Sequence, residues 1–154
     1  MQFSEFLDFE AIKSAFPAGN KRSLLQQLAN QSAQRLGLDA PAILASLIER
    51  ESLGSTGFGN GVAIPHGKVD GLNRIYCMFV RLSEPIDYKA IDSAPVDLVF
   101  LLLSPTDAGA EHLKALAAIS RVTRHHAILD KMRGARSADA LAAVLMGADE
   151  RDAA

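Results

Sequence analysis

The stretch Val96–Ser104, with the sequence VDLVFLLLS, places the strongest constraint on how this chain can fold. Almost every position in it is apolar, so a strand formed there would need cover on both of its faces. This pattern is typical of a central strand that lies between two layers of helices. A second apolar run, Ile75–Leu82, predicts another strand, and we expect a shorter strand over Gly61–Ile64.

Helical signals precede, separate and follow the predicted strands. N-cap residues, apolar residues at helical spacing and terminal glycines predict helices within residues 20–37, 39–54 and 137–147. Another helix is expected after Pro105, with His112 in its first turn and Leu113 and Leu116 marking its period. The expected fold is therefore a single-domain α/β layered sandwich, with a mixed β-sheet flanked by helices. We expect this domain to cover residues 1–147 and residues 148–154 to form a frayed C-terminal tail.

Composition excludes several classes of protein. The chain has 154 residues, 49% of them hydrophobic, which is enough for one ordinary core. Its net charge of −2 and the absence of a basic run argue against binding to nucleic acid. The single cysteine, Cys77, cannot form an internal disulfide and is predicted to be a buried small hydrophobe. Residues 1–10 lack the basic residues of a signal peptide, and the longest apolar run, Ala140–Met146, is too short for a membrane helix. We expect a cytoplasmic protein without membrane insertion.

The segment Ser52–Lys68, SLGSTGFGNGVAIPHGK, contains five glycines and a single histidine, His66. Glycine lets the backbone approach a ligand closely, but each glycine costs conformational entropy on folding. The segment is therefore expected to be either poorly ordered or shaped around something.

Common glycine-rich and metal-binding motifs do not fit. A P-loop has four residues between its glycines and a hydroxyl after its lysine, whereas this segment has five residues there and Val69. A dinucleotide fingerprint ends in Gly or Ala, where the two possible frames place Val62 or Ile64. His125 and His126 are adjacent, so they would point in different directions from a helix, and a solvated helix end is the simpler interpretation.

Three residues remain as candidates: Arg50, His66 and His112. Each has an ordinary structural explanation, as a helix-end charge, a solvated turn residue and a partly buried side chain, respectively. However, Pro65 fixes the backbone before His66, and Gly67 leaves one side of the ring uncovered. A helix N-terminus suits an anion and disfavours an imidazolium, so His112 would be neutral and able to donate a hydrogen bond. A nucleophilic histidine, an arginine and such a helix terminus together could hold a phosphoryl group on nitrogen.

The segments RESLGSTGFGNGVAIPHGKVDGL, PIDYKAIDSAPVDLVFLLLSP and EHLKALAAISRV resemble the fructose/mannitol/nitrogen-type IIA proteins of the bacterial phosphoenolpyruvate phosphotransferase system. The resemblance covers residues 24–145 and is strongest to the stand-alone nitrogen-regulatory branch of the family. It implies a mixed sheet flanked by helices. It also implies that His66 accepts a phosphoryl group from an HPr-like carrier protein, while His112 holds the phosphate or orients His66. Arg50 would neutralise the group in transfer. No ATP, metal or organic cofactor would be needed, because the phosphoryl group arrives already activated on nitrogen.

The resemblance has further implications for the loop and the partners. A set of residues would shape the loop around His66: Thr56, Gly57, Gly59, Gly61, Pro65 and Gly67. The loop would leave a shallow rim with apolar groups such as Phe58, Val62 and Ile64, where a partner protein docks. The phosphorylation state would control binding to regulatory targets such as kinases or transporters.

Two other functions stay open at this point. The chain could be a sugar-specific IIA component that passes the phosphoryl group to a IIB domain for fructose- or mannitol-type uptake. Alternatively, it could be a non-catalytic module whose glycine segment binds a small anion without a covalent step.

Overall fold

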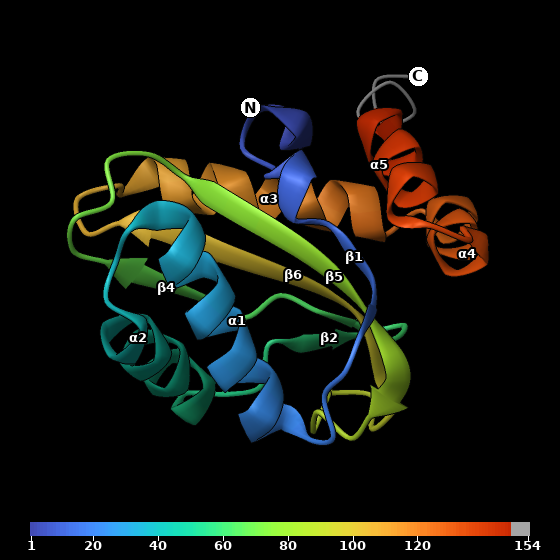
Figure 1. The fold of residues 1–154 in the computed structure, drawn as a ribbon, viewed down its shortest axis with the longest axis horizontal. Helices are drawn as coiled ribbons and strands as arrows, with labels where there is room; N and C mark the ends of the chain where they lie inside the picture. The colour runs from blue at the N-terminus through green and yellow to red at the C-terminus, as the bar shows by residue number, and fades with distance from the viewer. Residues whose placement is uncertain (149–154) are drawn as a thin grey trace.

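The computed structural model describes residues 1–148, which form three layers: helices, a mixed β-sheet, and further helices (Figure 1). The strands are β1 (Lys13–Phe16), β2 (Gly57–Gly59), β3 (Val62–Ala63), β4 (His66–Val69), β5 (Tyr76–Ile86) and β6 (Val96–Pro105). The α-helices are α1 (Lys21–Leu36), α2 (Ala40–Ser52), α3 (Ala110–Thr123), α4 (His126–Gly134) and α5 (Ala138–Met146). Two short 3-10 helices, Phe3–Glu5 and Phe9–Ala11, precede β1. The predicted α/β layered fold is confirmed.

Strand β6 is the centre of the sheet. The strand order is β1-β5-β6-β3-β2, and β4 also pairs with β6, further along the same strand than β3. Strand β6 runs antiparallel to β5 and parallel to both β3 and β4. The split between β3 and β4 falls at Ile64 and Pro65, and proline cannot donate a ladder hydrogen bond. As a result, His66 begins a new short strand against β6.

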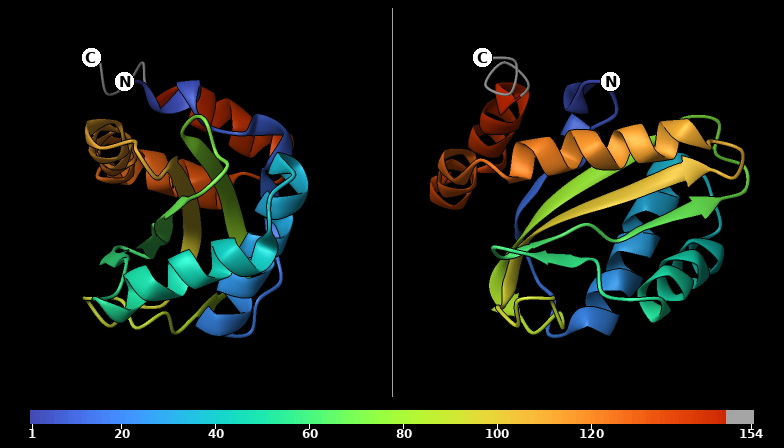
Figure 2. Two further views of the ribbon diagram at one scale, coloured as in Figure 1. Left: turned by 90° about the vertical axis from the view of Figure 1, so that its left-hand side faces the viewer. Right: turned by 180° about the vertical axis from the view of Figure 1, so that it is seen from behind.

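Both faces of β6 are buried, as its sequence predicts. Val99, Leu101 and Leu103 belong to a core cluster shared with α1 and α2. The alternate residues Leu98, Phe100 and Leu102 belong to a second cluster, shared with α3, α4 and α5. Figure 2 shows α3 on the opposite side of the sheet from α1 and α2. Cys77 is fully buried in the second cluster, as expected, and this burial raises the pKa of its thiol.

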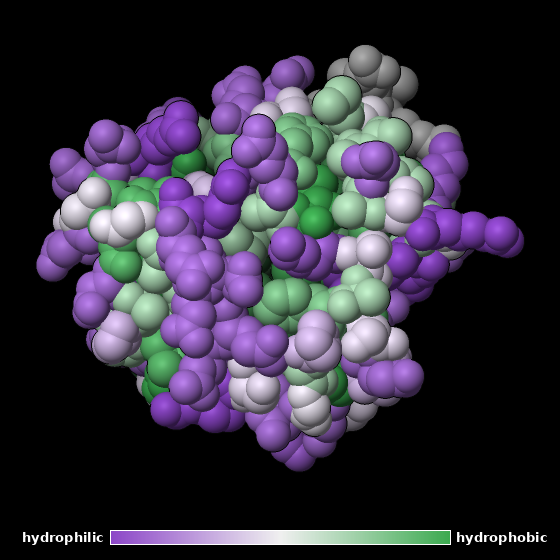
Figure 3. Space-filling model, viewed as in Figure 1, coloured by the Kyte–Doolittle hydropathy of each residue, from purple (hydrophilic) through white to green (hydrophobic). Residues whose placement is uncertain are grey.

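The first two helices begin and end where the sequence predicts. The Asn20 side chain accepts a hydrogen bond from the Ser23 amide (2.8 Å), and Gly37 ends α1 in the left-handed conformation with φ of 68°. Asp39 caps α2 in the same way, by accepting from the Ala42 amide. The outer face of α1 is polar, and Figure 3 shows hydrophilic residues over much of the surface on that side of the molecule.

Several local predictions were incomplete or wrong. Strands β1, β2 and β4 and helix α4 were not predicted, and His125 and His126 lie at the start of α4. In α3 the buried face is formed by Ala115, Ala118, Ile119 and Val122, whereas Leu113 is exposed.

The predicted tail begins too early, because Ala148 is 1% exposed and packs in the second core cluster. Residues 149–154 of that tail lie outside the described residues. None of the helices described in residues 1–148 is long and apolar enough to cross a membrane.

Candidate functional site

His66 lies where the end of α2 and the start of α3 meet the edge of the sheet. It is the first residue of β4 and pairs with Leu102 of β6. The strand is anchored immediately before it, because the Pro65 carbonyl accepts from the Leu102 amide (3.0 Å). The expectation of a loop histidine with an uncovered ring was wrong, since His66 is only 6% exposed. Pairing with β6, which the local sequence does not reveal, makes this segment a strand.

The hydrogen bonds of His66 define its protonation state. Nδ1 lies 2.7 Å from the carbonyl oxygen of Ile64, which can only accept, so Nδ1 carries the proton. Nε2 then holds a lone pair and accepts from Nε of Arg50 at 3.1 Å. Burial lowers the pKa of His66 below its usual value, and the positive charge of Arg50 lowers it further. The ring is therefore neutral at pH 7, with Nε2 as its nucleophilic atom.

Arg50 lies in the last turn of α2, as predicted. Its Nη1 donates to the carbonyl oxygen of Gly54 at 2.8 Å, so the guanidinium is held by the segment that follows the helix. The side chain combines a fixed position with a permanent positive charge next to Nε2 of His66. This is a suitable arrangement for contacting an anion bound to that nitrogen.

His112 lies in the first turn of α3, also as predicted. The centres of its ring and the His66 ring are 5.4 Å apart, with 51° between the ring planes. Nδ1 of His112 lies 2.6 Å from the hydroxyl oxygen of Ser104, the penultimate residue of β6. Burial, followed by the nearby His66 and Lys68, lowers the pKa of His112 to about 4, so this ring is also neutral at pH 7. The structure thus brings all three candidates, Arg50, His66 and His112, to one place.

These residues line one cavity of about 440 Å³. Its other lining residues are Ser46, Glu49, Leu53, Gly67, Lys68, Leu113 and Leu116. The most exposed apolar groups beside it are Leu53 and Leu113, which are 81% and 67% exposed.

The predicted apolar rim was placed wrongly. Val62 and Ile64 are buried in the second core cluster, because they lie on the face of the sheet that packs against α3. Phe58 is 46% exposed, and together with Val62 and Ile64 it lines a different, smaller cavity near Ser120 and Thr123.

The glycine segment is held by a buried polar cluster that the sequence analysis missed. The carboxylate of Glu51 accepts from the amide and the hydroxyl of Thr56, and it forms an ion pair with Lys21 of α1 at 2.7 Å. The Thr56 hydroxyl also lies 2.9 Å from the phenol oxygen of Tyr88. Thr56 and Tyr88 are fully buried. Because Glu51 is next to Arg50, this cluster fixes the end of α2 that presents the guanidinium.

Two glycines are required by close packing. A Cβ on Gly57 would lie 2.8 Å from both Cα and Cβ of Ala90, and one on Gly67 would overlap the Ser46 hydroxyl of α2. Gly59 and Gly61 instead flank the turn at Asn60 between β2 and β3, both with positive φ. Of the four glycines predicted to shape the site, only Gly67 lines the cavity around His66. The other three shape the neighbouring hairpin.

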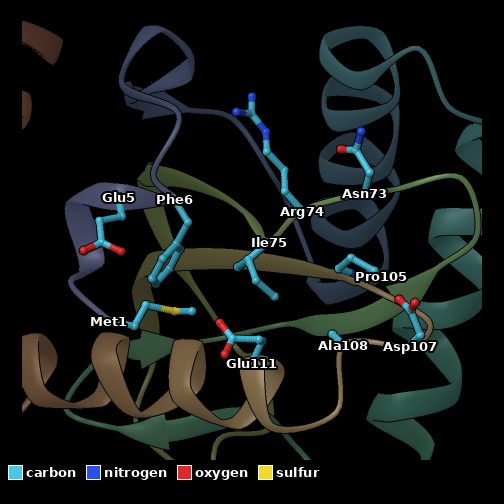
Figure 4. A pocket seen from close by; sticks show the side chains of 10 residues that line it. All are labelled: Met1, Glu5, Phe6, Asn73, Arg74, Ile75, Pro105, Asp107, Ala108 and Glu111. Carbon is cyan, nitrogen blue, oxygen red and sulfur yellow. The ribbon is translucent and has the colours of Figure 1, made fainter.

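A second cavity of similar size, about 450 Å³, lies beside the start of α3, where Ala108 and Glu111 line it (Figure 4). Its lining includes the acidic residues Glu5, Asp107 and Glu111, and Arg74 is the one lysine or arginine among the lining residues. It contains no histidine, so volume does not distinguish the two cavities but chemistry does. Across residues 1–148, no group of three or more His, Cys, Asp or Glu side chains is placed to hold a metal ion.

Comparison with known proteins identifies the family. Residues 5–147 match the family described as "Phosphoenolpyruvate-dependent sugar phosphotransferase system, EIIA 2", and the chain belongs to this family. The resemblance found in the sequence is therefore confirmed. A nitrogen regulatory protein of Bradyrhizobium diazoefficiens is 46% identical over 145 residues, which cover 94% of this chain and 95% of the relative.

Two further comparisons extend this result. The crystal structure of the nitrogen regulatory protein IIA-Ntr from Neisseria meningitidis superposes with a TM-score of 0.85 at 33% identity, covering 92% of this chain and 97% of that one. A fructose-specific EIIA component of Haloferax volcanii is 38% identical over 107 residues, or 70% of each chain. The similarity thus extends to a regulatory and to a sugar-specific member of the family.

Proposed function

We propose that this chain is a regulatory phosphoryl carrier, which accepts a phosphoryl group at Nε2 of His66 from a phosphohistidine on an HPr-like protein. The observation that carries the proposal is the state of His66. Its Nδ1 donates a hydrogen bond to the Ile64 carbonyl, and its unprotonated Nε2 accepts from Arg50 in a cavity that His112 also lines. A neutral imidazole of this kind is a competent nucleophile.

The proposed transfer exchanges one N–P bond for another. Nε2 of His66 attacks the phosphorus, a new N–P bond forms, the bond to the carrier's imidazole breaks, and that imidazole leaves with the electron pair. The proton on Nδ1 of His66 stays in place, and the Ile64 carbonyl oxygen, 2.7 Å away, stabilises the positive charge that the ring acquires. Arg50 leaves its contact with Nε2 and binds phosphoryl oxygens instead. The reaction needs no ATP, metal or organic cofactor, because the group arrives already activated on nitrogen.

The carrier and the regulatory targets would use the same surface. Phosphorylation adds up to two negative charges next to Leu53 and Leu113, the exposed apolar groups beside the cavity. A target that buries those leucines would have to desolvate the phosphate, which is costly without a cationic partner. We therefore propose that the unphosphorylated form binds targets such as kinases or transporters. Phosphorylation would weaken this contact by about 1–3 kcal/mol. The functional unit would be the domain predicted over residues 1–147, together with Ala148, which packs in its core.

Intact mass after incubation with phosphoenolpyruvate, enzyme I and the HPr-like carrier tests the transfer. We expect one added phosphoryl group that is labile in acid and stable in base. A non-catalytic anion-binding module would show no mass change. The sugar-specific alternative is tested by adding a IIB domain: rapid onward transfer to it would favour uptake over regulation. Pull-down with unmodified, phosphorylated and His66→Ala protein as bait tests whether phosphorylation controls target binding. Equal recovery of the same partners by all three baits would contradict the regulatory proposal.

A further inference from the structure

Ser104 forms a side-chain hydrogen bond with His112, the second histidine of the site. It is the penultimate residue of β6 and fully buried, and its hydroxyl oxygen lies 2.6 Å from Nδ1 of His112. In the register of β4 with β6, Ser104 pairs with Lys68, two residues beyond the pair His66 and Leu102. Since side chains alternate along a strand, Ser104 points to the same face of the sheet as Leu102, which packs in the cluster beneath α3. A polar residue is thus placed at the end of an otherwise apolar strand, directly under His112.

The direction of this hydrogen bond follows from the burial of Ser104. A serine hydroxyl has one proton to donate, and a buried donor without an acceptor is costly. Within residues 1–148, the only hydrogen-bond partner of the Ser104 side chain is Nδ1 of His112. The hydroxyl therefore donates and Nδ1 accepts, which leaves the proton of the neutral imidazole on Nε2. His112 then presents an N–H donor from a half-buried position that lines the cavity around His66.

We propose that Ser104 is a positioning residue that fixes His112 in the Nε2–H tautomer, so that His112 donates a hydrogen bond to the phosphoryl group on His66. The inference rests on the proposed function for its kinetic consequence. Its structural part, the tautomer of His112, stands apart from phosphoryl transfer. Without the serine hydroxyl, the proton can move to Nδ1, and Nε2 then turns a lone pair toward the anion. Ser104 contacts no reacting atom and acts only through His112.

Two substitutions at Ser104 separate its hydroxyl from its size. Ser104→Ala removes the donor, whereas Ser104→Thr keeps it and adds a methyl group that strands accommodate readily. Ser32→Ala is the matched control, because Ser32 is also a fully buried serine whose hydroxyl bonds within α1, to the Leu28 carbonyl at 2.7 Å. All three proteins are compared with the wild type in urea unfolding, so that a general loss of stability is recognised.

Long-range proton–nitrogen NMR of the imidazole rings reads the tautomers directly. In the wild type we expect a protonated Nε2 on His112 and a protonated Nδ1 on His66. Ser104→Ala should shift His112 toward a mixture of tautomers and leave His66 unchanged, while Ser104→Thr and Ser32→Ala should match the wild type. A wild-type His112 protonated on Nδ1, or a tautomer unaffected by Ser104→Ala, would overturn the proposal.

Single-turnover transfer from the phosphorylated carrier measures how the tautomer of His112 affects the rate of phosphoryl transfer. At metal sites, partners that fix a histidine tautomer are worth about 10–100-fold, and we expect Ser104→Ala to slow transfer about tenfold, with Ser104→Thr near the wild-type rate. A tautomer change with unaltered rates would remove the role of Ser104 in transfer. If even the wild type accepts no phosphoryl group, the proposed function fails, while the NMR result still decides the tautomer.

Discussion

The two histidines of the site are neutral rings held in opposite ways. His66 begins a strand and is bound through Nδ1 to a backbone carbonyl, whereas His112 lies in the first turn of a helix and is bound through Nδ1 to a side-chain hydroxyl. A carbonyl can only accept, so it leaves His66 with a lone pair on Nε2. The buried hydroxyl donates, so it leaves His112 with a proton there. The same ring thus serves as nucleophile or as donor according to the group behind it, and only the second group can be removed by mutation.

The largest effect is expected from the nucleophile itself. His66→Ala should abolish phosphoryl acceptance, as measured by intact mass. Because His66 is buried and forms two hydrogen bonds, this change should also cost about 1–3 kcal/mol of stability, in contrast to a loop residue. Urea unfolding measures that cost, and His126→Ala, which removes an exposed histidine on α4, is the control. Full phosphorylation of the His66→Ala protein would move the acceptor to another residue, with His112 the first to test.

The next effect separates a donor from a bulky ring. His112→Ala should slow transfer about 10²–10³-fold, the usual cost of losing one donor to a developing charge. Glutamine can place an N–H near the position of Nε2, so His112→Gln should recover part of this loss. Rapid-quench measurements in the forward and reverse directions compare the two variants. Equal rates for alanine and glutamine would contradict the donor role, and wild-type rates for both would remove His112 from the mechanism.

A smaller effect is expected from the shape of the cation. Arg50→Lys keeps the charge but loses the planar fork that can bind two phosphoryl oxygens and hold Nε2 of His66. We expect transfer to slow about tenfold, within the 10–100-fold range seen when an orienting partner is removed. Arg22→Lys, on the exposed face of α1, should be indistinguishable from the wild type. The same kinetic assay decides, and an unimpaired Arg50→Lys protein would reduce Arg50 to a helix-end charge.

The smallest effect is on stability against pH. The pKa values of both histidines are lowered on folding, so the unfolded chain takes up protons first as pH falls below about 6.5. Stability should therefore be highest above pH 6.5 and decline as pH falls toward 4, the pKa of His112 in the folded protein. Carboxylates with lowered pKa, such as Asp8, begin to contribute only below about pH 5, at the acid end of this window. Urea midpoints at several pH values should show a shallower decline for His112→Ala, and an identical slope would refute this account.

The sequence was most informative where the signal is local. The central strand, the caps at Asn20 and Asp39, and the positions of Arg50 and His112 within their helices follow from short patterns, and the structure confirms them. Strand β4 has no such pattern, since His66–Val69 is four residues long and becomes a strand by pairing with a distant segment. That pairing also buries His66, which explains why its exposure was predicted wrongly.

The supporting side chains are missed for the same reason. Glu51 and Thr56 are close in sequence, but Tyr88 reaches them from 32 residues away. Ser104 is different, because a polar residue at the end of an apolar central strand is visible in the sequence and could have been noted. The contact of Ser104 with His112 could not be predicted, because His112 lies eight positions further along the chain, beyond a turn.

The pairing of β4 with β6 also determines where this chain can change in length. His66 is opposite Leu102, and Ser104, which carries His112, lies two residues further along β6. One residue inserted between Leu102 and Ser104 would displace Ser104 by about 3.3 Å and turn its side chain to the other face of the sheet. The connection between β4 and β5, by contrast, has exposed residues at Asn73 and Arg74, where added residues leave both registers intact. Among descendants of this sequence, insertions and deletions should therefore accumulate in the connection between β4 and β5 and be absent from the end of β6, where it pairs with β4.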